Sequence, residues 1–93
     1  FSINCEFNSE RSSRIAFNEE QTMFKHTTET MTSIYYVDYQ EHIVKEGVNY
    51  YWYEVTSDAG NRYILIVDLI SEKVKFMAWN GTYIIITTIK ALF

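Results

Sequence analysis

The chain has 93 residues, enough for one domain but not for two, because each half alone would be too small to bury a core. It is 17% aromatic and 47% hydrophobic, with Pro 0 and Gly 3, and it is rich in Ile, Thr, Val and Tyr; this excludes a helical bundle and a collagen-like or disordered chain. Its single Cys cannot form an internal disulfide, and its formal net charge of -4 argues against nucleic-acid binding. We therefore expect residues 1–93 to form a single domain.

The first half of the chain predicts four short strands, at 3–7, 14–17, 23–26 and 33–39. Asn18 to Gln21 is expected to be a turn between the second and third strands. Asn18 followed by two Glu could instead cap a short helix that runs to about Thr28, but the threonines that follow disfavour a helix, because β-branched residues lose rotamer freedom there. The polar segment 41–49, which contains Gly47, is the best candidate for the longest loop.

The second half predicts a four-stranded antiparallel meander, with strands at 50–57, 62–68, 73–79 and 82–89. Asn80-Gly81 separates the last two strands, and a type I′ turn there needs positive φ at both residues. The turn formers at 58–61 separate the first two strands. Asn80-Gly81-Thr82 also matches the N-glycosylation sequence, although the turn already explains the Asn and the Gly.

These elements together predict an all-β fold of about seven short antiparallel strands, either a small sandwich or a calycin-like half-barrel. In the strand 73–79, Val74, Phe76 and Ala78 share the core face. The strands 62–68 and 82–89 are apolar on both faces, so something must cover their second face. Within one molecule, only the first half of the chain could do so.

Strand alternation also sends large side chains away from this core. If Tyr51, Tyr53 and Val55 face inward, their neighbours face outward. We predict four outward side chains as the binding residues, namely Tyr50, Trp52, Met77 and Trp79. A contiguous outward aromatic patch suits a partner surface, and the alternative is that the first-half strands cover it as a second layer.

The histidines, His26 and His42, have none of the spacings of metal sites, so we predict no metal site. An acidic cluster surrounds His42, formed by Asp38, Glu41 and Glu46; it could hold a hard cation weakly or be a solvated loop.

Nothing in the sequence carries a catalytic signature. Cys5 with either histidine could form a thiol dyad, but no local motif supports one, and the simpler interpretation is a small buried hydrophobe in the first strand. There is neither a G-x-S-x-G elbow nor a glycine-rich phosphate loop. We therefore expect no enzyme and no cofactor.

The sequence thus predicts a non-enzymatic interaction or structural protein, exported or virion-associated, that binds a protein partner or itself through an aromatic face and β-prone strands. The segments 63–67 and 83–89 are uncharged and free of Pro, as in strands that pair with other chains when an edge is open. If the last strand is such an edge, the N-terminal arm 1–9 is a candidate donated strand.

The alternative function is a small-molecule carrier with an apolar barrel cavity, lined by Tyr51, Tyr53, Tyr63, Leu65 and Phe76. A third hypothesis is an inhibitor whose acidic first half docks on a basic target. The chain does not start with Met, and cleavage of a secretory signal would explain this, so a secreted or periplasmic location is expected. No stretch approaches the roughly 18 apolar residues of a membrane span.

Overall fold

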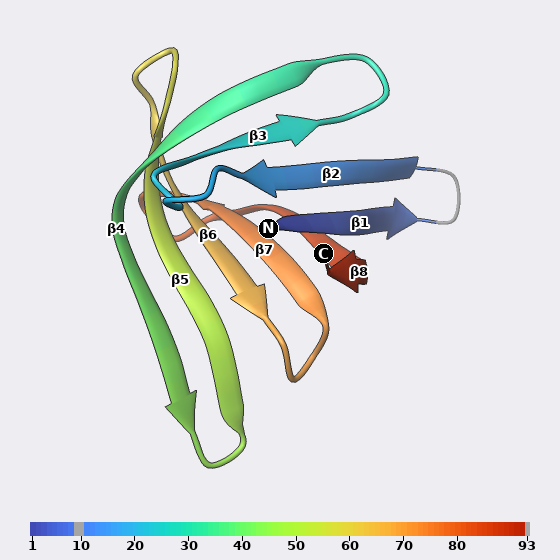
Figure 1. The fold of residues 1–93 in the computed structure, drawn as a ribbon, viewed down its shortest axis with the longest axis vertical. Coiled ribbons are helices and arrows are strands. Elements are labelled where there is room, and N and C mark those ends of the chain that lie inside the picture. Colours follow the sequence, from blue (N-terminus) through green and yellow to red (C-terminus); the bar gives the residue numbers. More distant parts are fainter. Residues whose placement is uncertain (9–10, 93) are drawn as a thin grey trace.

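Eight antiparallel strands close into a barrel in which each strand pairs with the next along the chain and the last pairs with the first (Figure 1). This computed structural model describes residues 1–8 and 11–92. The strands are β1 (Ser2–Asn8), β2 (Arg11–Phe17), β3 (Met23–Thr27), β4 (Thr32–Lys45), β5 (Val48–Ser57), β6 (Arg62–Asp68), β7 (Lys73–Ala78) and β8 (Tyr83–Leu92). The all-β antiparallel prediction is confirmed. Of the two predicted architectures the structure has the barrel, which closes completely and has eight strands where about seven were predicted.

The predicted second layer over the meander does not form. Strands β1 to β4 continue the same sheet, with β4 pairing to β5 and β1 pairing to β8. Their own apolar side chains, such as Ile3, Ile15 and Phe24, are needed inside the barrel and are almost fully buried there. β1 to β4 therefore form part of the barrel wall rather than a second layer over β6 and β8.

The predicted loop at 41–49 is wrong. β4 continues to Lys45, β5 begins at Val48, and their ladder runs without a loop from Tyr35↔Ser57 to Lys45↔Val48 around a turn at Gly47. This hairpin projects beyond the rest of the barrel in Figure 1. Most of its side chains are polar, as expected for strands that project into solvent, while the backbone groups are still paired across the hairpin.

The four meander strands are confirmed within a few residues at their ends. The Asn80-Gly81 hairpin also forms, but not with the predicted type I′ turn, because only Gly81 has a positive φ, of 90°. The Gly81 amide donates to the carbonyl of Ala78 at 2.9 Å, and the Asn80 side chain accepts from the Thr82 amide at 3.0 Å. A turn followed by a left-handed glycine is the other common way to join two short strands.

The turn predicted after the second strand is confirmed, and the helix alternative is not. The side-chain oxygen of Asn18 accepts hydrogen bonds from the amides of Thr22 (2.9 Å) and Met23 (3.3 Å). This amide side chain therefore caps a turn that leads directly into β3. None of the described residues lies in a helix of the length and apolarity that a membrane crossing requires.

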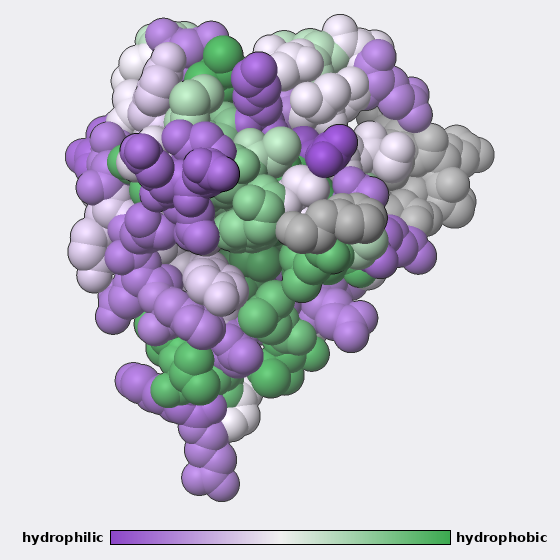
Figure 2. Space-filling view, in the orientation of Figure 1, coloured by the Kyte–Doolittle hydropathy of each residue, from purple (hydrophilic) through white to green (hydrophobic). Residues whose placement is uncertain are grey.

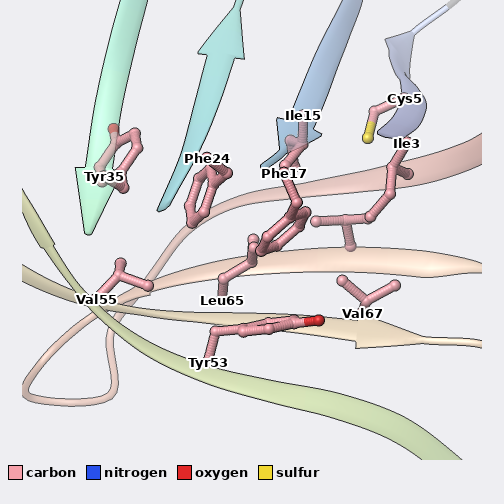
Figure 3. Close-up of a cluster of buried hydrophobic side chains, with 11 residues drawn as sticks. Ile3, Cys5, Ile15, Phe17, Phe24, Tyr35, Tyr53, Val55, Leu65 and Val67 are labelled. Carbon is pink, nitrogen blue, oxygen red and sulfur yellow. The ribbon is translucent and has the colours of Figure 1, made fainter. Parts of the chain in front are cut away.

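Stacked aromatic rings fill the barrel (Figure 3). The ring of Phe24 lies 5.0 Å from that of Phe17 and 5.0 Å from that of Tyr35. Tyr53 is fully buried, with its ring 4.8 Å from Phe17, and Val55 is also fully buried, so the inward orientation predicted for these β5 residues is confirmed. Because these rings occupy the interior, the barrel has a packed core rather than an open channel.

Candidate functional site

The four predicted binding residues lie on the outer face of the barrel, as alternation indicated. Trp52 of β5 pairs with Ile66 of β6, and Ile66 pairs with Lys75 of β7. Lys75 in turn pairs with Ile86 of β8. Side chains in one such row point to the same face of the sheet. Trp52 therefore begins an outer-face row that crosses the meander and ends on β8.

These four residues differ in how they meet solvent. Met77 is only 7% exposed, although it points outward. Trp52 is half-buried, and its indole N–H donates to a carboxylate oxygen of Glu54 at 3.0 Å. Trp79 is 45% exposed, and the guanidinium of Arg62 lies 3.8 Å from its ring centre. Tyr50 is half-buried. Strand β6 separates Tyr50 and Trp52 on β5 from Met77 on β7, so the four residues are not brought into one row of the sheet.

The most exposed apolar run of the meander lies on β8, outside the predicted set. Tyr83, Ile84, Ile85 and Ile86 are 54%, 49%, 36% and 44% exposed. The sequence did mark 83–89 as β-prone, but its two-sided apolar pattern indicated a covered strand. In the barrel the outer side of this strand faces solvent, and the exposure of Ile85 shows that the inner side is also partly open.

In the described ladders, the backbone of this run pairs with a neighbouring strand on one side only. β7 pairs with Tyr83 to Thr88 of β8, whereas β1 pairs only with Thr88 to Leu92. The amide of Ile89 donates to the carbonyl of Glu72, on the β7 side, at 2.8 Å. Since successive residues of a strand point their backbone groups to opposite sides, the N–H and C=O of Ile86 point away from β7.

The N-terminal arm is not a free strand, so its predicted role as a donated strand is wrong. β1 is paired with β2 on one side and with β8 on the other, and Ile3 is fully buried. The phenyl ring of Phe1 stacks on Phe17 at 4.7 Å. The arm is thus built into the barrel wall and helps to close one barrel end.

A second apolar surface lies at that same end. In Figure 2, apolar surface gathers in the lower half of the view, where Figure 1 draws the β6–β7 turn and the β4–β5 hairpin. Ile70 and Val44 are each 62% exposed in these two segments. Ile70 is thus an exposed isoleucine outside β8.

The opposite barrel end, at the β3–β4 turn, opens into a cavity of about 580 Å³ lined by residues of β2, β3, this turn and β8. A smaller void of about 30 Å³ lies deeper, and the two share four lining residues, among them His26 and Ile85. The predicted carrier lining is therefore only partly right. Leu65 and Phe76 line the deeper void, while the fully buried Tyr53 is part of the packed core.

Cys5 and His26 both line the deeper void, but not as an activated pair. Burial raises the pKa of the Cys5 thiol, against the opposing effect of hydrogen bonds from the side chains of Thr87 and Ser13. Burial also lowers the pKa of His26. Both pKa shifts favour the neutral thiol and the neutral imidazole, whereas a nucleophilic cysteine needs a thiolate beside an imidazolium. Cys5 is thus a buried residue of strand β1, as the simpler interpretation held.

The acidic cluster around His42 is split by the strand pairing. Asp38 accepts a hydrogen bond from Thr56, and Glu41 accepts one from the Tyr39 hydroxyl at 3.0 Å. The His42 ring stacks on Tyr51 at 4.0 Å, and its Nε2 is 2.8 Å from the side-chain oxygen of Asn49. Among the described residues, no group of three His, Cys, Asp or Glu side chains is placed to hold a metal ion.

The neutral state of His26 predicts a loss of stability in acid. Below its ordinary pKa of 6.5 the unfolded chain binds a proton that the folded chain does not, so stability falls as the pH drops from 6.5 through the lower pKa of the folded state. We expect His26→Gln to make the midpoint of urea unfolding depend less on pH in this range. Parallel profiles for the two proteins would contradict this role of His26.

Comparison with known proteins found no match among protein-family models, curated proteins or solved structures.

Proposed function

We propose that this chain is a non-enzymatic binding protein that associates with a second copy of itself through strand β8. The observation that carries this proposal is the run Tyr83 to Ile86, which is exposed, apolar and paired on one side only in the described ladders. An open, apolar strand edge is a template for pairing with another chain. A second copy supplies a strand with the same properties, so both copies gain backbone hydrogen bonds and bury apolar side chains.

Charge favours β8 over the other open edge of the barrel. β3 pairs with β4 only over Thr32 to Tyr36, so much of the projecting part of β4 has no ladder on that side. That part carries Asp38, Glu41 and Lys45, and charged side chains protect an edge from pairing. The segment 82–89 has no charge, so two copies with a net charge of -4 each meet there without opposing like charges.

The symmetry of such a pair fixes its register. Antiparallel pairing centred on Ile85 places Ile84 opposite Ile86 of the second copy and the two Ile85 residues opposite each other. This register directs the backbone groups of Ile86 toward the partner strand. The β7–β8 ladder is regular from Ile85 to Thr88 and shifts by one residue at Ile84. The two barrels then share one continuous sheet across the seam.

Sedimentation velocity over a wide concentration series tests this proposal. The wild-type protein should shift from 11.1 kDa toward twice that mass as its concentration rises. Ile86→Glu should raise the dimer Kd by roughly two orders of magnitude, because it places a carboxylate from each copy at the seam. The register pairs residue 86 with Lys75 of the same chain, so the new carboxylate has an opposite charge beside it and the monomer should fold.

Ile70→Glu is the matched control, since it adds the same charge at an exposed isoleucine in the β6–β7 turn. It should leave the dimer Kd unchanged. A wild-type protein that stays at 11.1 kDa at every concentration, or equal effects of the two substitutions, would overturn the proposal. Tyr50, Trp52, Met77 and Trp79 stay a predicted surface for a further protein partner, and the exported or virion-associated location also stays a prediction.

A small-ligand carrier is the second candidate function. The cavity of about 580 Å³ at the open barrel end favours it, because this volume falls within the range of small-molecule sites.

A further inference from the structure

The cavity at the open barrel end has a polar rim and an apolar wall. Five Ser and Thr residues line it, namely Ser12, Ser13, Thr28, Thr30 and Thr87. They come from β2, the β3–β4 turn and β8, so they face the cavity from three sides. The Thr28 hydroxyl also hydrogen-bonds to the backbone of Met31, and those of Ser13 and Thr87 to Cys5. Ile85 contributes apolar surface next to Thr87 on β8. A ligand held here would meet hydroxyl groups around its edge and a branched aliphatic side chain along one face.

The charge of the lining selects among ligand classes. Glu29 is the one acidic side chain among the described residues that line this cavity, and neither Lys nor Arg is among them. The imidazole of His26 is kept neutral by burial. Among the described lining residues, a carboxylate, sulfate or phosphate on a ligand would meet neither Lys nor Arg and would lie near the like charge of Glu29. Uncharged hydroxyl, carbonyl or ether oxygens can instead form hydrogen bonds with the Ser and Thr hydroxyls.

The depth of the site limits the size of the apolar part of the ligand. The deeper void of about 30 Å³ adjoins the cavity and is lined mostly by apolar side chains, including Ile15, Phe24 and Leu65. A void of this size holds about two water molecules or one methyl-sized group. A long acyl chain cannot enter the core. The bulk of the ligand must therefore lie in the outer cavity, against Ile85.

The geometry points to a binding site for an uncharged, compact amphiphile, such as a ring compound with hydroxyl or ether groups, at the open end of the barrel. This inference rests on the second candidate function, carriage of a small ligand. The hydroxyl rim holds the polar groups of the ligand, Ile85 contacts its apolar body, and Glu29 repels anionic analogues.

Two fluorescent probes of similar ring structure but different charge test the inference. N-phenylnaphthylamine is uncharged, and anilinonaphthalene sulfonate is an anion. The uncharged probe should bind with a Kd at least about tenfold lower than that of the anion. Glu29→Gln should narrow this difference, because it removes the repulsive carboxylate without changing the size of the rim.

Two matched substitutions locate the bound probe. Ile85→Trp should fill the cavity and raise the Kd of the uncharged probe about tenfold or more. Ile70→Trp makes the same change at an exposed isoleucine of the β6–β7 turn, outside the cavity lining, and should leave the Kd unchanged. Ser13→Tyr narrows the cavity from β2 and gives a second blocking variant if Ile85→Trp does not fold.

The outcomes separate the inference from the function on which it rests. If neither probe binds, or if both blocking variants bind like the wild type, then the carrier function is wrong and the inference fails with it. If both probes bind equally and both blocking variants lose them, the carrier function stands and the selection for uncharged ligands is wrong. Repeating the titration with Ile86→Glu, which opposes pairing through β8, keeps the result independent of self-association.

Discussion

Replacing Phe24 by Ala is expected to lower the free energy of unfolding by about 3–5 kcal/mol. Phe24 is 1% exposed, and its ring lies between those of Phe17 and Tyr35, 5.0 Å from each. Its removal leaves a cavity in the middle of the aromatic core and breaks two ring contacts at once. Since small domains have a net stability of about 5–15 kcal/mol, this variant should unfold at a much lower urea concentration, which circular dichroism measures.

Two variants calibrate this result. Phe24→Leu keeps most of the buried volume and should cost less than about 1.5 kcal/mol. Met31→Ala removes a large side chain that is 63% exposed in the β3–β4 turn, and its effect should stay within about 0.5 kcal/mol. A loss below about 1 kcal/mol for Phe24→Ala would show that the ring stack does not hold the barrel together.

Local patterns in the sequence predicted the meander well. The strand 62–68 was predicted with its observed ends, because turn-forming residues flank it on both sides. Alternation on β5 placed Tyr53 and Val55 inside, since the twofold period of a strand depends only on its own residues. The turn type at Asn80-Gly81 was wrong, because two turn families accept the same residues and differ only in the φ of Asn80.

Long-range pairing is where the sequence was insufficient. Closure depends on β1 meeting β8, which pairs Ile3 with Leu92 across nearly the whole chain, and no local pattern records this contact. The apolar outer faces of β6 and β8 therefore indicated a covering layer that a closed barrel does not have. Likewise, the polar residues of 41–49 indicated a loop, although strands that project into solvent have the same composition.

The candidate sites divide in the same way. The outward orientation of Trp52 and Trp79 follows from alternation and was predicted. The cavity was not, because it joins Thr28 of the β3–β4 turn with Ile85 of β8, which are far apart in sequence. The sequence shows that the exposed run on β8 is uncharged and β-prone. A buried strand can have the same composition, so composition alone did not predict that this run is exposed.

A covalent bond between two copies is expected if β8 pairs with itself in the register centred on Ile85. In that register the two residues 85 face each other directly, and opposed residues of antiparallel strands have Cα atoms about 4.5–5.5 Å apart, within the range of disulfides. We therefore expect Ile85→Cys, made together with Cys5→Ala, to form a disulfide-linked dimer under mild oxidation. Ile70→Cys in the same background should stay monomeric, although position 70 is more exposed (62%) than position 85 (36%).

The most direct test of self-association through β8 is this cross-linking yield, measured on non-reducing gels as the protein is diluted. Our account predicts that the residue 85 variant becomes mostly dimer, that the residue 70 variant does not, and that adding Ile86→Glu abolishes the dimer. Equal yields at positions 85 and 70, or a yield at position 85 that Ile86→Glu leaves unchanged, would contradict pairing through β8.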